Sequence, residues 1–268
     1  MIPAFELSRP KTLDEAMRQV ADGGVPYVGG TELVAAMQIG LIAPPLLVDL
    51  KRLPELCGVT AGEEGLTIGA ATRHREIAAS PEVRAAAPIL AAACAGLGNM
   101  RVRATGSIGG NICFADPRSD VNTALFALGA ELVLRSAEGT RTVPVGDVVL
   151  GAMDSDLDDG EILVAVRVPR APAAQVYVRH QPTEYPTVCV AMTWDRSRPD
   201  DGLGIVLGAV GERPQTFTAP APDAVDTDAL LPGVETIEDL NGSDEYKRHL
   251  AGVFITRAAR TMRETHGD

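Results

Sequence analysis

The sequence predicts an α+β fold in which two mixed α/β subdomains precede a smaller domain made of a sheet and a helix. In the first two thirds of the chain, short apolar runs typical of strands alternate with helical segments that begin at capping residues. After the linker-like segment Pro169–Ala174 (PRAPAA), strand-like runs follow one another until a long helical segment closes the chain. We therefore expect one domain over residues 1–170, with subdomains over about 1–55 and 56–170, and a second domain over 175–268.

The N-terminal subdomain is predicted from one capping box and two apolar runs. Thr12 and Glu15 open a helix over residues 12–22 with an apolar face. Val25–Val28 and Leu46–Leu50 are strand candidates, and a helix from Glu32 to about Ile39 lies between them. Strand, helix and strand together form a small α/β unit that ends near residue 51.

The second subdomain shows the same mixture of elements. Its helices are predicted from start signals, because Ser80 followed by a proline and Pro88 each mark the first turn of a helix. A further helix is expected around Asn122–Leu128. The expected strands are Leu66–Ala70, a hairpin formed by Glu131–Ser136 and Arg141–Val145, and Ile162–Val168.

The C-terminal domain is expected to be a three-stranded antiparallel sheet covered by one helix. Its three strand-like runs are Val176–His180, Thr187–Trp194 and Gly202–Gly211. Residues 213–233 are rich in Pro, Ala and Asp and are expected to be a loop with little regular structure. Ser243 is the cap of the closing helix.

Composition excludes several classes of protein. The chain has 268 residues, 46% of them hydrophobic, and a formal net charge of −12, which argues against binding to nucleic acid or to anionic membranes. No apolar run approaches the roughly 20 residues of a membrane helix, and the start MIPAFELSRPKTLDEA does not resemble a signal peptide. We expect a cytoplasmic protein. The four cysteines are scattered and predict neither a disulfide framework nor a metal cluster.

Two glycine-rich motifs stand out. Residues 101–120 read RVRATGSIGGNICFADPRSD, and residues 25–37 read VPYVGGTELVAAM. Glycines beside small polar residues allow backbone N–H groups to converge on an anion, as in phosphate-binding loops. Neither motif is G-x-G-x-x-G or a Walker sequence. A tight structural turn is the alternative for each motif alone, whereas two such motifs suit a ligand with two phosphates.

The two motifs, their order and the trailing ADPRSD resemble the FAD-binding medium subunit of the molybdenum hydroxylases. This family includes carbon monoxide dehydrogenase, xanthine dehydrogenase and relatives that oxidise aldehydes and heterocycles. The resemblance implies a PCMH-type FAD-binding fold in which two subdomains sandwich FAD. It also implies that the FAD is non-covalent, because Thr31 occupies the position where related flavin oxidases carry the linking histidine.

The resemblance assigns FAD-binding positions in both motifs and beyond them. The implied set is Val28, Gly29, Gly30, Thr31, Glu32, Leu33, Leu97, Ser107, Ile108, Gly109, Gly110, Asn111, Asp116, Asp120, Leu163 and Arg179.

The implied roles differ along this set. Ser107 and Asn111 would donate to the cofactor, and Ile108 would form a wall against the flavin. Leu97 has an ordinary core leucine as its alternative, and Asp116 a turn former.

Two further positions would lie close to the flavin. Arg179 would place a cation near the reactive edge of the flavin, its alternative being a surface arginine. Tyr185 would shield a flavin face, its alternative being a structural tyrosine beside a proline turn.

The implied function is electron transfer by a subunit of a larger enzyme. In the family's scheme a large subunit holds a molybdenum cofactor, and a small subunit holds [2Fe-2S] clusters that deliver electrons to the FAD. The FAD passes them to NAD, a quinone or another acceptor, and the complex is expected to be a dimer of heterotrimers. The alternatives are a free-standing flavoprotein oxidase or dehydrogenase that acts on a small organic substrate, and a scaffold that has lost its flavin.

Overall fold

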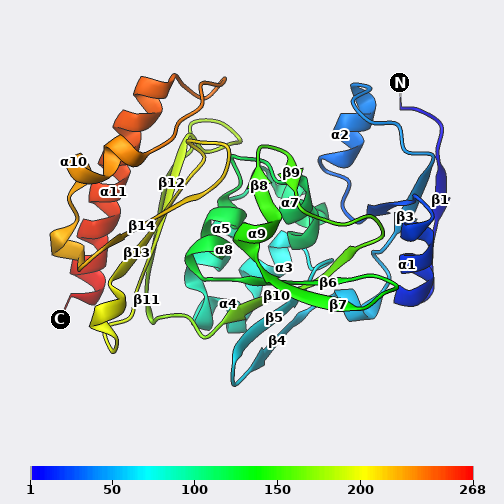
Figure 1. Cartoon of the computed structure of the whole chain (residues 1–268), viewed down its shortest axis with the longest axis horizontal. Coiled ribbons are helices and arrows are strands. Elements are labelled where there is room, and N and C mark those ends of the chain that lie inside the picture. Colours follow the sequence, from blue (N-terminus) through cyan, green and yellow to red (C-terminus); the bar gives the residue numbers. More distant parts are fainter. Residues whose placement is uncertain (1, 268) are drawn as a thin grey trace.

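The computed structural model describes residues 2–267, which form three units, each with its own sheet (Figure 1). The first unit contains a parallel sheet in the order β1-β3-β2, together with two helices. Its elements are β1 (Glu6–Ser8), α1 (Leu13–Ala21), β2 (Val25–Tyr27), α2 (Leu33–Gln38) and β3 (Leu46–Asp49). The predicted helices and strands between residues 12 and 50 are confirmed, and β1 is additional.

Local signals explain this unit. The Thr12 hydroxyl accepts a hydrogen bond from the N–H of Glu15 at 3.2 Å and caps α1. The apolar face of α1 packs against the central strand β3, where Val48 is fully buried. Pro26 cannot donate to a sheet and lies in β2, which is an edge strand.

The second unit contains a five-stranded antiparallel sheet in the order β4-β5-β10-β6-β7 and a group of short helices. The strands are β4 (Val59–Gly62), β5 (Gly65–Gly69), β6 (Glu131–Arg135), β7 (Thr140–Pro144) and β10 (Ile162–Pro169). The helices are α3 (His74–Ala79), α4 (Pro81–Ala86), α5 (Pro88–Gly96), α6 (Met100–Thr105), α7 (Ile108–Phe114), α8 (Asp120–Ala127) and α9 (Val145–Val148). A small ribbon of β8 (Val149–Gly151) and β9 (Asp154–Ser155) precedes β10.

The third unit is an antiparallel sheet in the order β11-β12-β13-β14, covered by a long helix. Its strands are β11 (Ala174–His180), β12 (Val188–Trp194), β13 (Leu203–Gly208) and β14 (Gln215–Ala219). The helix α11 (Asp244–His266) covers one face, and α5 and α8 of the second unit lie on the opposite side (Figure 1). The sheet is therefore buried between helices from two parts of the chain.

The third sheet has four strands, and the expectation of three was wrong. Strand β14 pairs with β13 in the segment 213–233 that was expected to be a loop, and α10 (Thr227–Leu230) follows it. The reason is that β14 is a short edge strand with the sequence QTFTA, in which Phe217 is the only large apolar residue. Such a strand is formed by pairing with its neighbour and has almost no hydrophobic signal of its own.

The three sheets do not by themselves define the domain boundaries. The polypeptide passes from β10 to β11 through residues 170–173, and the boundary expected there stays a prediction, as does the division near residue 55. Within residues 2–267, no helix combines the length and the apolar character that crossing a bilayer requires.

We predict that α11 is held mainly by its buried apolar face. Ile255 is fully buried in the core between α11 and the third sheet. Ile255→Ala should lower the free energy of unfolding by about 2–4 kcal/mol, because it leaves a cavity in a packed core. Chemical denaturation measures this change. The matched control is Arg260→Ala on the same helix, which removes only an exposed pair with Glu264 and should change stability by less than about 1 kcal/mol. Equal effects of the two changes would contradict the prediction.

Candidate functional site

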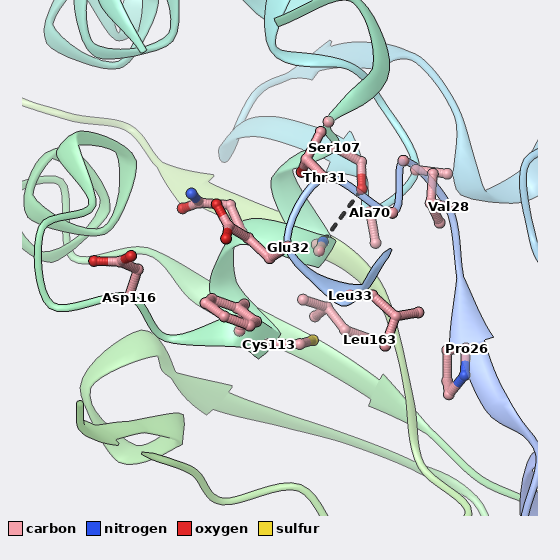
Figure 2. Close-up of a pocket in the computed structure, with 18 of the residues that line it drawn as sticks. Pro26, Val28, Thr31, Glu32, Leu33, Ala70, Ser107, Cys113, Asp116 and Leu163 are labelled. Atoms are coloured by element: carbon pink, nitrogen blue, oxygen red, sulfur yellow. Dashed lines mark hydrogen bonds between the residues drawn. The ribbon is translucent and has the colours of Figure 1, made fainter. Parts of the chain in front are cut away.

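A cavity of about 550 Å³ lies where the three units meet. Its walls come from residues 20–33 of the first unit, from several segments between residues 70 and 163 of the second, and from residues 184–186 of the third. Both glycine motifs face this cavity (Figure 2). All of the predicted site residues line it except Ile108 and Arg179.

Gly29 and Gly30 are required by the backbone of the first motif. A Cβ atom at Gly29 would lie 2.2 Å from the carbonyl oxygen of Thr105, so the backbones of the two motifs touch at this point. Gly30 has a φ of +67°, and a Cβ atom there would lie 2.6 Å from the ring of Tyr27. Any larger residue at either position would separate the two motifs or strain the turn.

The first motif presents unpaired donors. Residues 28–32 connect β2 to α2, and the N-cap residue Glu32 makes no capping hydrogen bond through its side chain. Within residues 2–267, the backbone N–H groups of Gly29, Gly30, Thr31 and Glu32 have no hydrogen-bond acceptor. Unpaired N–H groups in a turn that leads into a helix are the donors that anion sites use. The expected anion-binding role therefore fits the first motif.

The second motif is different, and the expectation that its N–H groups are free was wrong. Residues 108–114 form the helix α7, capped by Ser107, whose Oγ accepts from the N–H of Gly110 at 3.2 Å. The N–H of Ile108 donates to Thr72 at 3.1 Å, and that of Gly109 donates to Ala70 at 2.8 Å. The start of α7 is thus tied to the chain segment after β5, and its amides at 108–110 are already paired.

The two glycines of α7 have different surroundings. A Cβ atom at Gly109 would lie 2.8 Å from the Cβ atom of Ala70, so this glycine allows close packing of the helix on the end of β5. Gly110 is exposed, and a Cβ atom there would meet only Ser107 Oγ, at 3.2 Å. Gly110 therefore keeps space open on the cavity wall.

Side chains supply the donors on this wall. Ser119 donates to the Asn111 side-chain oxygen at 2.6 Å, which orients the Asn111 amide. The Asn111 amide NH₂ and the Ser107 hydroxyl hydrogen remain available to a ligand in the cavity. Ser119 was missed by sequence reasoning, although its position as the N-cap of α8 was a usable signal.

Asp116 holds Arg118 against the cavity. Its carboxylate accepts two hydrogen bonds from the Arg118 guanidinium, at 2.9 and 2.7 Å, and one from the Arg118 N–H at 2.8 Å. The last bond is the turn geometry that was the alternative for Asp116. The guanidinium stacks 3.8 Å from the ring centroid of Tyr185, which comes from the third unit. Arg118 was not predicted, and the ion pair of Asp116 with a residue two positions later was its only local signal.

Asp120 connects the cavity to the third sheet. Its side chain is 1% exposed and accepts hydrogen bonds from the Tyr177 hydroxyl and from Arg179 Nη1, the latter at 3.1 Å. Tyr177 and Arg179 are two residues apart on β11 and therefore share a face of the sheet. Burial raises the pKa of Asp120, and the hydrogen bond from Tyr177 and the charge of Arg179 oppose this effect.

Arg179 does not line the cavity. Its guanidinium packs against Gly96, where a Cβ atom would fall 2.0 Å from Nη2, and it is paired with Asp120. It is therefore not the solvent-facing arginine that was the alternative. Its expected place beside the flavin stays a prediction, because the structure connects Arg179 to the cavity only through Asp120.

Apolar side chains form the remaining walls. Val28, Leu33, Leu97 and Leu163 line the cavity, and Figure 2 shows Leu33, Leu163 and Cys113 together on one side. Ile108 is fully buried in the core of the second unit and is not among the residues that line the cavity, so its expected place against the flavin stays a prediction. Its position after the cap of α7 turns it towards the sheet.

Carboxylates shape the electrostatics of the cavity. The pKa of Glu32 is raised, first by burial and then by the charge of Asp116, while Arg118 opposes the shift. Buried carboxylates repel phosphate and accept hydrogen bonds from hydroxyl groups. These side chains therefore suit the hydroxyl-bearing part of a ligand, and the amides of residues 29–32 suit its phosphates.

His74 is a further wall residue that sequence reasoning missed. It is 2% exposed, lies beside Gly106, and has Nδ1 3.8 Å from the Cys94 sulfur. Burial lowers the pKa of His74 to about 4. The imidazole is therefore neutral at neutral pH and adds no charge to the cavity. A single histidine after β5 carried no recognisable signal.

The residues fit FAD. A cavity of this size is within the usual range for bound small molecules, roughly 300–1,000 Å³. FAD needs donors for a diphosphate, acceptors for hydroxyl groups and apolar walls for two ring systems. The first motif, the carboxylates and the leucines supply these in turn.

We predict that Gly110→Val weakens FAD binding without unfolding the chain. The new side chain would enter the cavity beside Ser107, while valine in a helix is no less favourable than glycine. The affinity for FAD should fall at least about tenfold, a loss of roughly 1.4 kcal/mol, measured by flavin fluorescence titration. Gly109→Val is the contrasting variant, because its clash with Ala70 should lower stability. Full FAD affinity in Gly110→Val would refute the placement of the site.

We also predict a pH effect from His74. Above pH 6.5 the histidine is neutral in the folded and the unfolded chain. As the pH falls from 6.5 to 4, the unfolded chain takes up a proton that the folded chain does not, so stability is lost. Over this range the loss should amount to about 3 kcal/mol. His74→Asn should lack this component in denaturation curves measured at several pH values, whereas the exposed control His249→Asn should keep it. A pH profile of His74→Asn that matches the unmodified chain would refute the prediction.

Comparisons with known proteins agree with this geometry. A family model described as the FAD binding domain in molybdopterin dehydrogenase matches residues 3–171. The chain is 29% identical over 282 residues to the carbon monoxide dehydrogenase medium chain of Hydrogenophaga pseudoflava, with 96% of each protein covered. It is 35% identical over 169 residues to the glyceraldehyde dehydrogenase medium chain of Sulfolobus acidocaldarius, covering 62% of this chain and 60% of that one.

Solved structures show the same fold over nearly the whole chain. A chain of carbon monoxide dehydrogenase from Hydrogenophaga pseudoflava has a TM-score of 0.87 at 30% identity, covering 98% of this chain and 99% of its own length. A chain of quinoline 2-oxidoreductase from Pseudomonas putida has a TM-score of 0.88 at 26% identity, covering 98% of both. The chain therefore belongs to the family of FAD-binding domains of molybdopterin dehydrogenases.

Proposed function

We propose that this chain is the FAD-binding electron-transfer subunit of a molybdenum hydroxylase. The observation that carries the proposal is the meeting of the two glycine motifs at one cavity, with unpaired amides on one side and side-chain donors on the other. FAD is the cofactor of the family, and this arrangement has the chemistry that FAD requires.

The proposed roles follow from the contacts of each residue. The amides of residues 29–32 would hold the diphosphate, and Ser107 and Asn111 would donate to its oxygens or to the ribitol chain. Asp120 would accept a hydrogen bond from the ligand while Tyr177 and Arg179 fix its orientation. Leu97 and Leu163 would cover ring systems. Thr31 offers no imidazole for a covalent link, so the FAD would be held without a covalent bond.

Bound FAD supplies the redox chemistry, because it takes up and releases electrons. The residues of this chain bind it, orient it and exclude water. Arg118 and Tyr185 would shield the cavity where the third unit reaches the second. The paired charges of Asp120 and Arg179 place a fixed dipole at the cavity wall. This dipole would change the free energy of a charged form of the ligand relative to its neutral form.

The proposed partners follow from the relatives. The matched proteins are named medium chains or subunits of dehydrogenases, which are parts of larger complexes. We infer a large subunit with a molybdenum cofactor and a small subunit with [2Fe-2S] clusters, assembled as a dimer of heterotrimers in the cytoplasm. Electrons would pass from the clusters to FAD and then to NAD, a quinone or another acceptor. Within this assembly, residues 1–170 would form the FAD-binding domain and residues 175–268 the second domain.

The composition of the native complex tests this function. The tagged chain, purified from its native source, should bring two further polypeptides, molybdenum and iron. Acid precipitation should release its FAD into the supernatant, because no covalent bond retains it. Extract from the untagged source is the control. A chain that purifies alone and oxidises a small organic substrate would overturn the proposal, and flavin that stays in the precipitate would overturn the non-covalent part.

A further inference from the structure

The loop from Asp156 to Glu161 closes one end of the cavity. It joins β9 to β10, and its residues from Leu157 onward line the cavity together with Val20, Gly23 and Gly24 at the end of the first helix. Among residues 2–267, the backbone hydrogen bonds that tie the loop to its surroundings come at its start, where the N–H of Asp156 donates to Val148 at 2.9 Å and that of Leu157 to Ser155 at 3.0 Å. The chain after Asp156 therefore needs another support.

The far side of this loop faces open space. A second hollow of about 500 Å³ lies there, lined by residues 158–161, by the hairpin turn 136–141 and by Ala21. The hairpin of β6 and β7 extends towards α1 (Figure 1). Its turn, residues 136–141, lines this hollow. Residues 158–161 are thus a thin wall with a cavity on each side, and core packing reaches the loop only through Leu157.

Arg141 on β7 supports both ends of the loop. Its Nε and Nη2 atoms donate to the two oxygens of the Glu161 carboxylate, each at 2.7 Å, and Nη2 also donates to the carbonyl of Asp156 at 3.2 Å. The same carboxylate accepts from the N–H of Asp158 at 3.0 Å. One guanidinium therefore fixes the first residue, the last residue and, through Glu161, the middle of the loop.

The ion pair between Arg141 and Glu161 has the features of a strong salt bridge. The Glu161 side chain is 7% exposed and that of Arg141 is 35% exposed, so the carboxylate is the better shielded partner. Bidentate pairs between arginine and carboxylate fix geometry as well as adding energy. The hydrogen bond from Arg141 also lowers the pKa of Glu161 below its usual value, so the carboxylate is charged at neutral pH.

We propose that Arg141 is a positioning residue for the FAD site. It holds the 156–161 loop as the end wall of the cavity, and separation of Arg141 from Glu161 lets the loop move into the hollow behind it and opens a route for FAD exchange. This inference rests on the proposed function, since it assigns the route by which that cofactor enters and leaves.

The rate of FAD release from the full-length chain tests the inference. The variants are Arg141→Gln, Glu161→Gln and the double variant. The matched control is Arg135→Gln on the neighbouring strand β6, which removes an exposed pair with Asp14 of α1 and leaves the contacts of the loop intact. Release is followed by the rise in free-FAD fluorescence after dilution. Each single variant should release FAD about tenfold faster, and the double variant should match the single ones, because both changes remove the same pair.

Two further measurements separate positioning from a general loss of stability. Limited proteolysis within residues 157–161 should accelerate in Arg141→Gln and not in Arg135→Gln, and Arg141→Lys should restore part of the slow release by keeping the charge. Unchanged release and unchanged proteolysis in Arg141→Gln would overturn the inference. A double variant that releases FAD faster by the product of the two single effects would also overturn it. An unmodified chain that binds no FAD refutes the proposed function, whereas a normal FAD content with unaltered release refutes only this inference.

Discussion

The contact between the backbones of Gly29 and Thr105 is the constraint on which the site depends. These residues belong to different units and lie far apart in the chain, and no side chain fits between them. Because the first motif touches the segment just before α7, its turn and the start of that helix share one cavity. A side chain at position 29 would move the units apart and separate the donors that one ligand must reach together.

The two glycine motifs look equivalent in sequence and have different physical roles. In the first, the backbone N–H groups of residues 29–32 have no acceptor within the described part of the chain, so they can donate to an anion. The second uses its amides to fasten α7 to Thr72, Ala70 and Ser107. Its contribution to the cavity is rigidity, an open wall at Gly110 and two side-chain donors. An anion held between the motifs would meet the rigid wall of the second motif on one side and the main-chain donors of the first motif on the other.

The third unit completes the cavity rather than standing apart from it. Tyr177 and Arg179 bind the buried Asp120, and Tyr185 stacks on Arg118. Three contacts with charged side chains thus run from the third unit to the cavity wall. The full-length similarity to the carbon monoxide dehydrogenase medium chain is consistent with this coupling, because the third unit is retained together with the glycine motifs.

The sequence by itself determined the elements whose signals are local. Caps at Thr12, Ser80 and Ser243 act within one helical turn, and their hydrogen bonds are present in the structure. The two motifs also identified the family and about half of the residues that line the cavity, since a glycine that is needed for a close approach is visible in the sequence.

Only the tertiary structure decided which side of each element meets the ligand. Ile108 and Gly110 are two residues apart, yet one is in the core and the other on the cavity wall, because α7 packs on the sheet through one side. Arg118, His74 and β14 gave almost no local signal, since each acquires its role from partners that are distant in the chain or from strand pairing. Packing between distant segments sets which side chains are buried and which strands pair. The pattern of neighbouring residues in the sequence does not encode that packing.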